Sequence, residues 1–432
     1  MAAALVASCG RPPEPRPAPA PVVVSAPEPE PEPEAAVEEE AVVARGPGLE
    51  GRLDDSFGRG GVVRVARGPG EHRFSGIVAL DDDSMVVVGY ARFADGSDMA
   101  AARVTKDGAL DESFGDHGFL RIGKYRGFGE GVARDAKGRL LAVGYFYAKG
   151  VNGLVARFDR HGVLDPSFGR SGLVVVDAGS DDRLNRVWVR KDGTIIAVGH
   201  HSSDKNMAVA LRSDGSLEPS FGQGGIGVVA SPGGTAYVTR AVPAPDGGVI
   251  AAGYLTAEHQ GLVIRLDANG KPDASFGRDG VAVVERPRVG SAWAVGVDAE
   301  GRVLLGVNTD VGPAAVFRLR KDGSMDTSFG KNGYALSTRD GMDQFYDLLA
   351  DPAGRIVGVG FRGLAEDATA LWARFTPEGE LDPAFGKGGI VSRPLGGGTF
   401  LFDADWDSQG RLVACGNVLQ GSGSPGIVAR FR

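Results

Sequence analysis

The sequence predicts an all-β protein, a seven-bladed β-propeller of four-stranded antiparallel blades, and three observations support this. A nine-residue segment recurs seven times, at spacings of 53 to 57 residues. Each unit divides into four short apolar segments separated by glycine-containing turns, as in one propeller blade. The last unit lacks its fourth segment, and the start of the array supplies one.

The recurring segment reads Leu-Asp-x-Ser-Phe-Gly-x-x-Gly. Its phenylalanine is present in every copy, and we expect it to wedge between neighbouring blades, contributing about 2–3 kcal/mol when buried. Its Asp and Ser are suited to capping turn amides. The alternative, a ring of Ca²⁺ sites, would have two oxygens per blade without further acidic ligands. The structural phenylalanines are Phe57, Phe114, Phe168, Phe221, Phe276, Phe329 and Phe385.

One unit illustrates the four predicted strands, which cover residues 184–190, 194–200, 206–212 and 226–230. Asp-Gly and related turns between them supply the positive φ angles that hairpins need. A second marker of register is a glycine at the end of the second strand, which Val307 replaces in the fifth unit. The glycines are Gly89, Gly144, Gly199, Gly253, Gly360 and Gly416.

The two ends of the array complement each other. The last unit stops with its third strand, at 427–432, whereas residues 48–61 and 62–66 form a turn and a fourth strand. Pairing of these ends would remove the open edge and close a ring. An open β-solenoid, the other architecture considered, has no need for this fit. We therefore expect residues 48–432 to form one closed, monomeric propeller.

The repeat with its preceding glycine, Gly-x-Leu-Asp-x-Ser-Phe-Gly-x-x-Gly, resembles the delta-60 repeat family of bacterial, often deltaproteobacterial, proteins. The resemblance covers residues 48–432 and implies a propeller-like repeat array but no activity. The departures from the pattern indicate that no single Asp–Ser pair is indispensable. They are Glu218, Pro272, Met325 and Ala384.

Two segments precede the array. The residues LVASC at 5–9 resemble a bacterial lipobox, which implies lipid attachment to Cys9, so residues 1–9 are interpreted as a truncated signal segment. The alternative is an accidental cysteine, since no Lys or Arg precedes the short apolar stretch. Residues 10–47 are rich in Pro and Glu and are predicted to be a disordered linker. Together these segments favour an outer-membrane-anchored lipoprotein of the bacterial cell envelope, on its periplasmic or surface face.

The net charge and the motif content of the sequence exclude several classes of function. The net charge is −8, and residues 1–44 carry −6 of it, so the near-neutral remainder lacks the basic stripe that nucleic acids require. Because no apolar run approaches the roughly 20 residues of a membrane helix, membrane contact is expected only through a lipid anchor. The sequence contains no nucleophile elbow, phosphate-binding loop or paired zinc spacing. We expect no cofactor, no metal site and no catalytic residue.

Residues that differ between blades are the candidates for function. The first strand of each blade should line the central channel, and aligning these strands reveals one polar column, next to an apolar core column. It contains two neighbouring arginines and two neighbouring aspartates, a candidate site for a ligand with separated charges. The alternative is structural Arg–Asp bridges across the channel. The four candidates are Arg186, Arg240, Asp347 and Asp403, with Glu130, Asn185 and Tyr346 beside them at the rim.

These observations favour a non-enzymatic binding or scaffold lipoprotein of the cell envelope. Its loops or channel mouth would meet a protein or glycan partner. The alternative is a propeller enzyme, a hydrolase or lyase, in which Asp347 and Asp403 act as acid and base.

Overall fold

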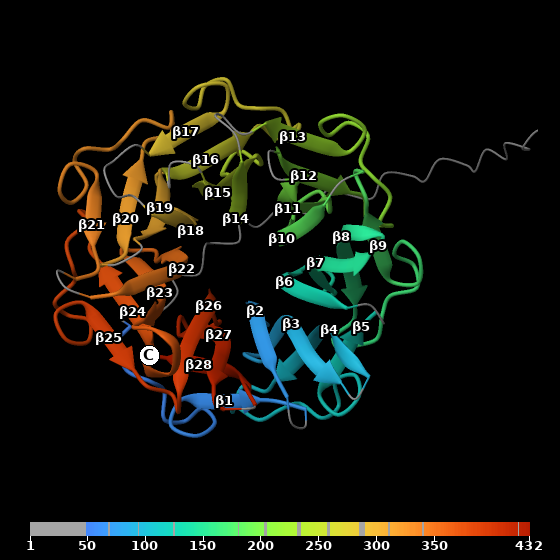
Figure 1. Cartoon of the computed structure of the whole chain (residues 1–432), viewed down its shortest axis with the longest axis horizontal. Helices are drawn as coiled ribbons and strands as arrows, with labels where there is room; N and C mark the ends of the chain where they lie inside the picture. Colours follow the sequence, from blue (N-terminus) through green and yellow to red (C-terminus); the bar gives the residue numbers. More distant parts are fainter. Residues whose placement is uncertain are drawn as a thin grey trace, which may run out of the picture. The chain divides into compact units, whose positions relative to one another are not determined.

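Seven four-stranded antiparallel sheets form a closed ring (Figure 1). The computed structural model describes residues 49–67, 70–93, 95–123, 126–179, 181–202, 205–230, 235–256, 260–284, 290–309, 312–338, 341–421 and 423–432. The predicted all-β, seven-bladed propeller is confirmed. The predicted signal segment 1–9 with Cys9 and the linker 10–47 lie outside the described residues.

Each blade has an inner strand, two middle strands and an outer strand (Figure 1). The inner strands are β2 (His72–Ala79), β6 (Gly127–Arg134), β10 (Asp182–Val189), β14 (Ala236–Pro243), β18 (Ser291–Val297), β22 (Asp343–Ala350) and β26 (Gly398–Trp406). The second strands are β3 (Met85–Phe93), β7 (Leu140–Ala148), β11 (Ile195–His201), β15 (Val249–Leu255), β19 (Val303–Asn308), β23 (Ile356–Arg362) and β27 (Leu412–Leu419). The third strands are β4 (Gly96–Val104), β8 (Gly150–Phe158), β12 (Lys205–Leu211), β16 (Gln260–Leu266), β20 (Ala315–Leu319), β24 (Thr369–Phe375) and β28 (Gly426–Phe431). The outer strands are β5 (Phe119–Ile122), β9 (Leu173–Val176), β13 (Ile226–Ala230), β17 (Val281–Val284), β21 (Tyr334–Leu336), β25 (Ile390–Arg393) and β1 (Val62–Val65).

The helical content of the described chain is one short 3₁₀ turn, η1 (Ala365–Asp367). Within the described ranges, no helix has the length and apolar character needed to span a membrane. This agrees with the strand-dominated pattern of the sequence.

Every inner strand carries a β-bulge, because its pairing with the second strand shifts by one residue near the middle. The glycine that marks the end of the second strand lies opposite this bulge. At Gly199, for example, an added Cβ atom would lie 1.8 Å from the carbonyl oxygen of Arg183. The recurrent glycine is therefore explained by close backbone approach rather than by an unusual φ angle.

Closure occurs as predicted. Outer strand β1 pairs with β28, so Val62 lies opposite Ala429 and Val65 opposite Gly426. A short bridge between Leu53 and Phe431 continues this pairing beyond the strand. The two ends of the array thus complete one blade, and no edge of β28 is left open.

The motif acid in every blade forms an ion pair with an arginine from the region where the third strand ends, at N–O distances of 2.7–3.4 Å. The pairs are Arg103–Asp111, Arg157–Asp165, Arg212–Glu218, Arg265–Asp273, Arg318–Asp326, Arg374–Asp382 and Arg430–Asp54. In all copies except that of Arg212, the guanidinium also donates to a backbone carbonyl in the next blade. The second oxygen of each acid caps the turn amide two residues later, as predicted.

One blade departs from this arrangement. Ala210 occupies the position that holds arginine in the other blades, eight residues before the motif acid. The motif acid there is Glu218, whose longer side chain reaches Arg212 at 3.0 Å. Arg190 stacks over Phe221 in place of the missing guanidinium, 5.5 Å from the ring centroid. The replacement of Asp by Glu in this copy is therefore coupled to the loss of the arginine.

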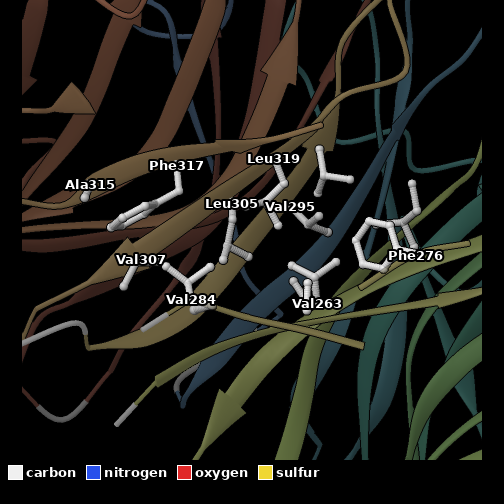
Figure 2. Packing of buried hydrophobic residues seen from close by; sticks show 14 of the residues in the cluster. Val263, Phe276, Val284, Val295, Leu305, Val307, Ala315, Phe317 and Leu319 are labelled. Atoms are coloured by element: carbon white, nitrogen blue, oxygen red, sulfur yellow. The ribbon is translucent and has the colours of Figure 1, made fainter. Parts of the chain in front are cut away.

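The seven motif phenylalanines are buried between blades, as predicted, with exposures of 0–2%. Figure 2 shows one such interface, in which Phe276 lies near Val263 of its own blade and Val295 of the next. Leu305 from strand β19 belongs to the same cluster. Because each phenylalanine joins two sheets, the core of this protein consists of seven inter-blade clusters rather than one central core.

Candidate functional site

The charged side chains of the predicted column meet inside the channel. Arg186 extends from β10 to the opposite side of the ring. One of its Nη atoms lies 2.5 Å from an oxygen of Asp403 in β26. The other donates to the carbonyl of Glu130 in β6, at 2.8 Å. Both charged side chains are only 12% exposed. A structural Arg–Asp bridge across the channel was the alternative to a ligand site, and Arg186 and Asp403 form such a bridge.

Arg240 extends from β14 across the channel and is 7% exposed. Its Nε donates to the carbonyl of Tyr346 at 3.0 Å, and one Nη donates to that of Phe402 at 2.6 Å. Burial, and then the charge of Arg186, lowers the pKa of Arg240 to about 10, so the side chain remains cationic at neutral pH. Together Arg186 and Arg240 connect five blades across the channel.

The two aspartates accept hydrogen bonds from the backbone. Asp347 accepts from the amides of Leu348 at 3.0 Å and Ala404 at 3.1 Å. The second oxygen of Asp403 accepts from the amide of Ile77 at 2.8 Å. Burial, and then the charge of Asp403, raises the pKa of Asp347 to about 7. Asp347 can therefore carry a proton near neutral pH.

A pocket of about 390 Å³ opens at the mouth of the channel where the inner strands begin. Arg240 belongs to its lining, whereas Arg186, Asp347 and Asp403 do not. The rim residues named from the sequence, Glu130, Asn185 and Tyr346, all line it. The full lining is Arg73, Glu130, Tyr145, Asp181, Arg183, Asn185, His200, Ser202, Tyr237, Val238, Thr239, Arg240, Tyr254, Trp293 and Tyr346.

One wall of the pocket is aromatic and comes from strands β14, β15, β18 and β22. Tyr237 lies 6.0 Å from Tyr254 between ring centroids, and Tyr254 lies 5.8 Å from Trp293. Trp293 in turn lies 5.3 Å from Tyr346. Burial raises the pKa of Tyr254 and of Tyr346, so both keep their hydroxyl protons. The wall therefore offers a continuous apolar surface with phenolic donors.

The facing wall comes from strands β2, β6, β7, β10 and β11 and is polar. Arg73 stacks over Phe402 at 4.1 Å and Arg183 over Tyr145 at 4.6 Å, measured to the ring centroids. Burial, and then Glu130, raises the pKa of Tyr145 to about 12. Burial, and then Arg183, lowers the pKa of His200 to about 4, so its imidazole is neutral at physiological pH.

Comparison with known proteins supports the fold. Parts of the sequence match a family model described as "Domain of unknown function (DUF5122) beta-propeller", over residues 80–114, 138–168 and 244–276. Each stretch runs from the inner hairpin turn of a blade to its motif phenylalanine. No curated protein matches the sequence.

Two solved structures resemble the chain at low sequence identity. A chain of the mitotic checkpoint complex is 12% identical with a TM-score of 0.51, and the alignment covers 95% of this chain and 98% of that one. The polysaccharide lyase Uly1 is 11% identical with a TM-score of 0.50, covering 83% and 90%. At such identities the likeness shows the shared propeller fold and nothing about activity.

Of the residues proposed from the sequence, Arg240, Glu130, Asn185 and Tyr346 line the pocket, whereas its other lining residues were not anticipated. One cause is the bulge, which breaks the strict alternation of side chains at Trp293. A signal was nevertheless available. In four blades the residue after the marker glycine is Tyr or Phe, and in a fifth it is His200.

Histidines and cysteine have separate roles in the described part of the chain. His200 lines the pocket, whereas Nδ1 of His201 contacts Asp182 at 2.6 Å, so the two histidines do not share a site. Cys415 is fully buried in β27. Across the described ranges, no cluster of three or more His, Cys, Asp or Glu side chains could hold a metal ion.

Proposed function

We propose that this chain is a non-enzymatic binding propeller whose channel-mouth pocket binds a glycan. The observation that carries the proposal is the pairing of an aromatic wall with a polar wall in one pocket of about 390 Å³. A pyranose ring has apolar C–H faces that pack on aromatic rings and hydroxyl groups that need hydrogen-bond partners. A pocket of this size accommodates a small ligand or one or two sugar rings of a longer chain.

The proposal predicts that Trp293→Ala weakens glycan binding at least about tenfold, because aromatic residues central to a binding site commonly contribute 2 kcal/mol or more. The full chain would first be screened on an array of neutral and acidic glycans. Calorimetry would then compare wild type with the variant on the best ligand.

Trp188→Ala provides a matched control, since Trp188 lies on inner strand β10 but outside the pocket lining. It should leave affinity within about twofold, and thermal unfolding of both variants would verify folding. An array without any bound glycan, or equal affinities for wild type and Trp293→Ala, would contradict the proposed function.

The enzyme alternative has one observation in its favour, the raised pKa of Asp347, which lies near a second carboxyl, that of Asp403. Against it, both carboxylates already accept hydrogen bonds from backbone amides, and Asp403 is bound to Arg186. Neither of them lines the pocket. Bound glycans should therefore be recovered intact. Cleavage by wild type that disappears in Asp347→Asn would favour a hydrolase or lyase.

We further propose that the propeller is held at the bacterial cell envelope by lipid on Cys9. The support is the lipobox-like segment 5–9, the Pro- and Glu-rich linker that follows and the resemblance to delta-60 repeat proteins of bacteria. Mass spectrometry of the native protein should find a lipid-modified Cys9 as the first residue, and Cys9→Ser should move the protein to the soluble fraction. An intact, unmodified Met1 would contradict the anchor.

A further inference from the structure

The polar wall of the pocket contains buried hydrogen-bond donors that the protein itself does not use. The Nε atoms of Arg73 and Arg183 are buried and have no hydrogen-bond partner in the described part of the chain. The same holds for Nδ1 of His200, whose residue is 9% exposed. Leaving such groups unsatisfied costs about 1–3 kcal/mol each, and more where the group is charged. The two arginine N–H groups in one pocket point to a ligand that supplies acceptors, and the neutral imidazole of His200 offers a further polar atom to it.

Stacking fixes how the two arginines can act. Each guanidinium lies over an aromatic ring, Phe402 for Arg73 and Tyr145 for Arg183. A stacked guanidinium uses its face for the ring and keeps its in-plane N–H groups for hydrogen bonds. That planar fork of donors matches the two oxygens of a carboxylate.

The charge of the lining also favours an anion. Arg73, Arg183 and Arg240 line the pocket against two acids, Glu130 and Asp181. Arg240 already uses N–H groups on backbone carbonyls, so the unoccupied donors for a ligand are those of Arg73 and Arg183, while Arg240 still contributes its positive charge. Of the two acids, Asp181 is exposed at the edge of the pocket, and Glu130 lies near Tyr145, the ring that Arg183 covers.

We propose that the glycan of this pocket is an acidic one, whose uronate carboxylate binds Arg73 and Arg183 while its ring packs on Trp293 and Tyr254. This inference rests on the proposed glycan-binding function. It adds the class of sugar, a hexuronate, and two residues that determine specificity.

Trigalacturonate and its fully methyl-esterified form provide the test, because esterification removes the carboxylate charge and adds only a methyl group to each sugar ring. The full chain should bind the acid form at least tenfold more tightly than the ester in calorimetry. Added NaCl should weaken binding of the acid form and leave that of the ester nearly unchanged. Arg73→Gln and Arg183→Gln should each reduce affinity for the acid form about tenfold to a hundredfold and leave the ester within about twofold.

Arg59→Gln is the matched control, since it removes the same charge from an exposed turn outside the pocket lining. Arg73→Lys keeps the charge but not the fork, and should recover less than half of the lost binding free energy. The wild-type comparison of acid and ester needs no variant, so it holds even if a substitution impairs folding.

Two failures are distinguishable. Equal binding of acid and ester, both lost in Trp293→Ala, would overturn the acidic-sugar inference and keep the glycan-binding function. Binding only to neutral glycans on the array would likewise overturn the acidic-sugar inference and keep the glycan-binding function. Absence of binding to every glycan would overturn both.

Discussion

Deletion of residues 49–66 should abolish cooperative folding of the propeller. This segment supplies β1, the fourth strand of the last blade, together with one copy of the repeat motif. Asp54 lies 2.9 Å from Arg430, and both side chains are at most 3% exposed. Phe57 is fully buried beneath the same arginine, 4.5 Å from its guanidinium carbon. The deletion removes all of these contacts at once.

The expected loss is large compared with the stability of a folded protein. Leaving Arg430 buried without its partner costs about 3–5 kcal/mol, and the cavity left by Phe57 costs a similar amount. Their sum approaches the 5–15 kcal/mol that typically separates folded from unfolded states. The freed edge of β28 would in addition pair with other molecules. Circular dichroism during heating and size-exclusion chromatography would measure both effects.

Deletion of residues 10–44 is the control for this experiment. These residues precede the array, so their removal should leave the melting temperature within a few degrees. If the chain without 49–66 melted as sharply as the control and stayed monomeric, ring closure would not be what stabilises this protein.

The second large loss of stability is expected for the substitution Arg374→Met. Arg374 is 2% exposed, and its Nε donates to Asp382 at 2.8 Å while one Nη donates to the carbonyl of Leu49 at 2.5 Å. It also lies 4.8 Å from the ring centroid of Phe385. Methionine would fill most of the volume but would leave Asp382 without its cation. We expect a loss of about 3–5 kcal/mol in the free energy of unfolding, measured by denaturant titration.

The chain contains its own control for that substitution. Arg212→Met breaks the equivalent pair in the blade where the arginine side chain is 52% exposed. Water screens this pair, so its loss should cost at most about 1 kcal/mol. Equal losses for both variants would mean that the motif ion pair acts through turn geometry rather than through burial of charge.

The sequence predicted the seven motif phenylalanines correctly but gave the motif acids only a turn-capping role. Their arginine partners were missed, because five of them lie eight residues earlier, across a turn, while Arg212 lies six residues earlier and Arg430 at the other end of the chain, and Ala210 interrupts the column. Only the folded blade reveals that the same aspartate caps a turn with one oxygen and binds a guanidinium with the other. The guanidinium then reaches the next blade, so the repeat motif joins blades as well as strands.

The candidate site, too, was predicted only in part from the sequence. Arg186, Arg240, Asp347 and Asp403 do meet in the channel, as their shared column implied. The two arginines, however, extend across the ring to Asp403 and to backbone carbonyls of other blades, and the pocket lies one layer closer to the mouth. No pattern along a single strand encodes such contacts, because each partner comes from a different blade.

The sequence by itself determined the number of blades, the register of their strands and the closure of the ring, since all three follow from local periodicity and turn chemistry repeated seven times. Only the tertiary structure decided which side chains face the pocket, because the bulge interrupts alternation and the blades contribute unequally: the β10–β13 and β14–β17 blades supply five lining residues each, and the last blade supplies none. It also decided which donors are already occupied. The free nitrogens of Arg73, Arg183 and His200 are defined by the absence of partners in space, which sequence order does not record.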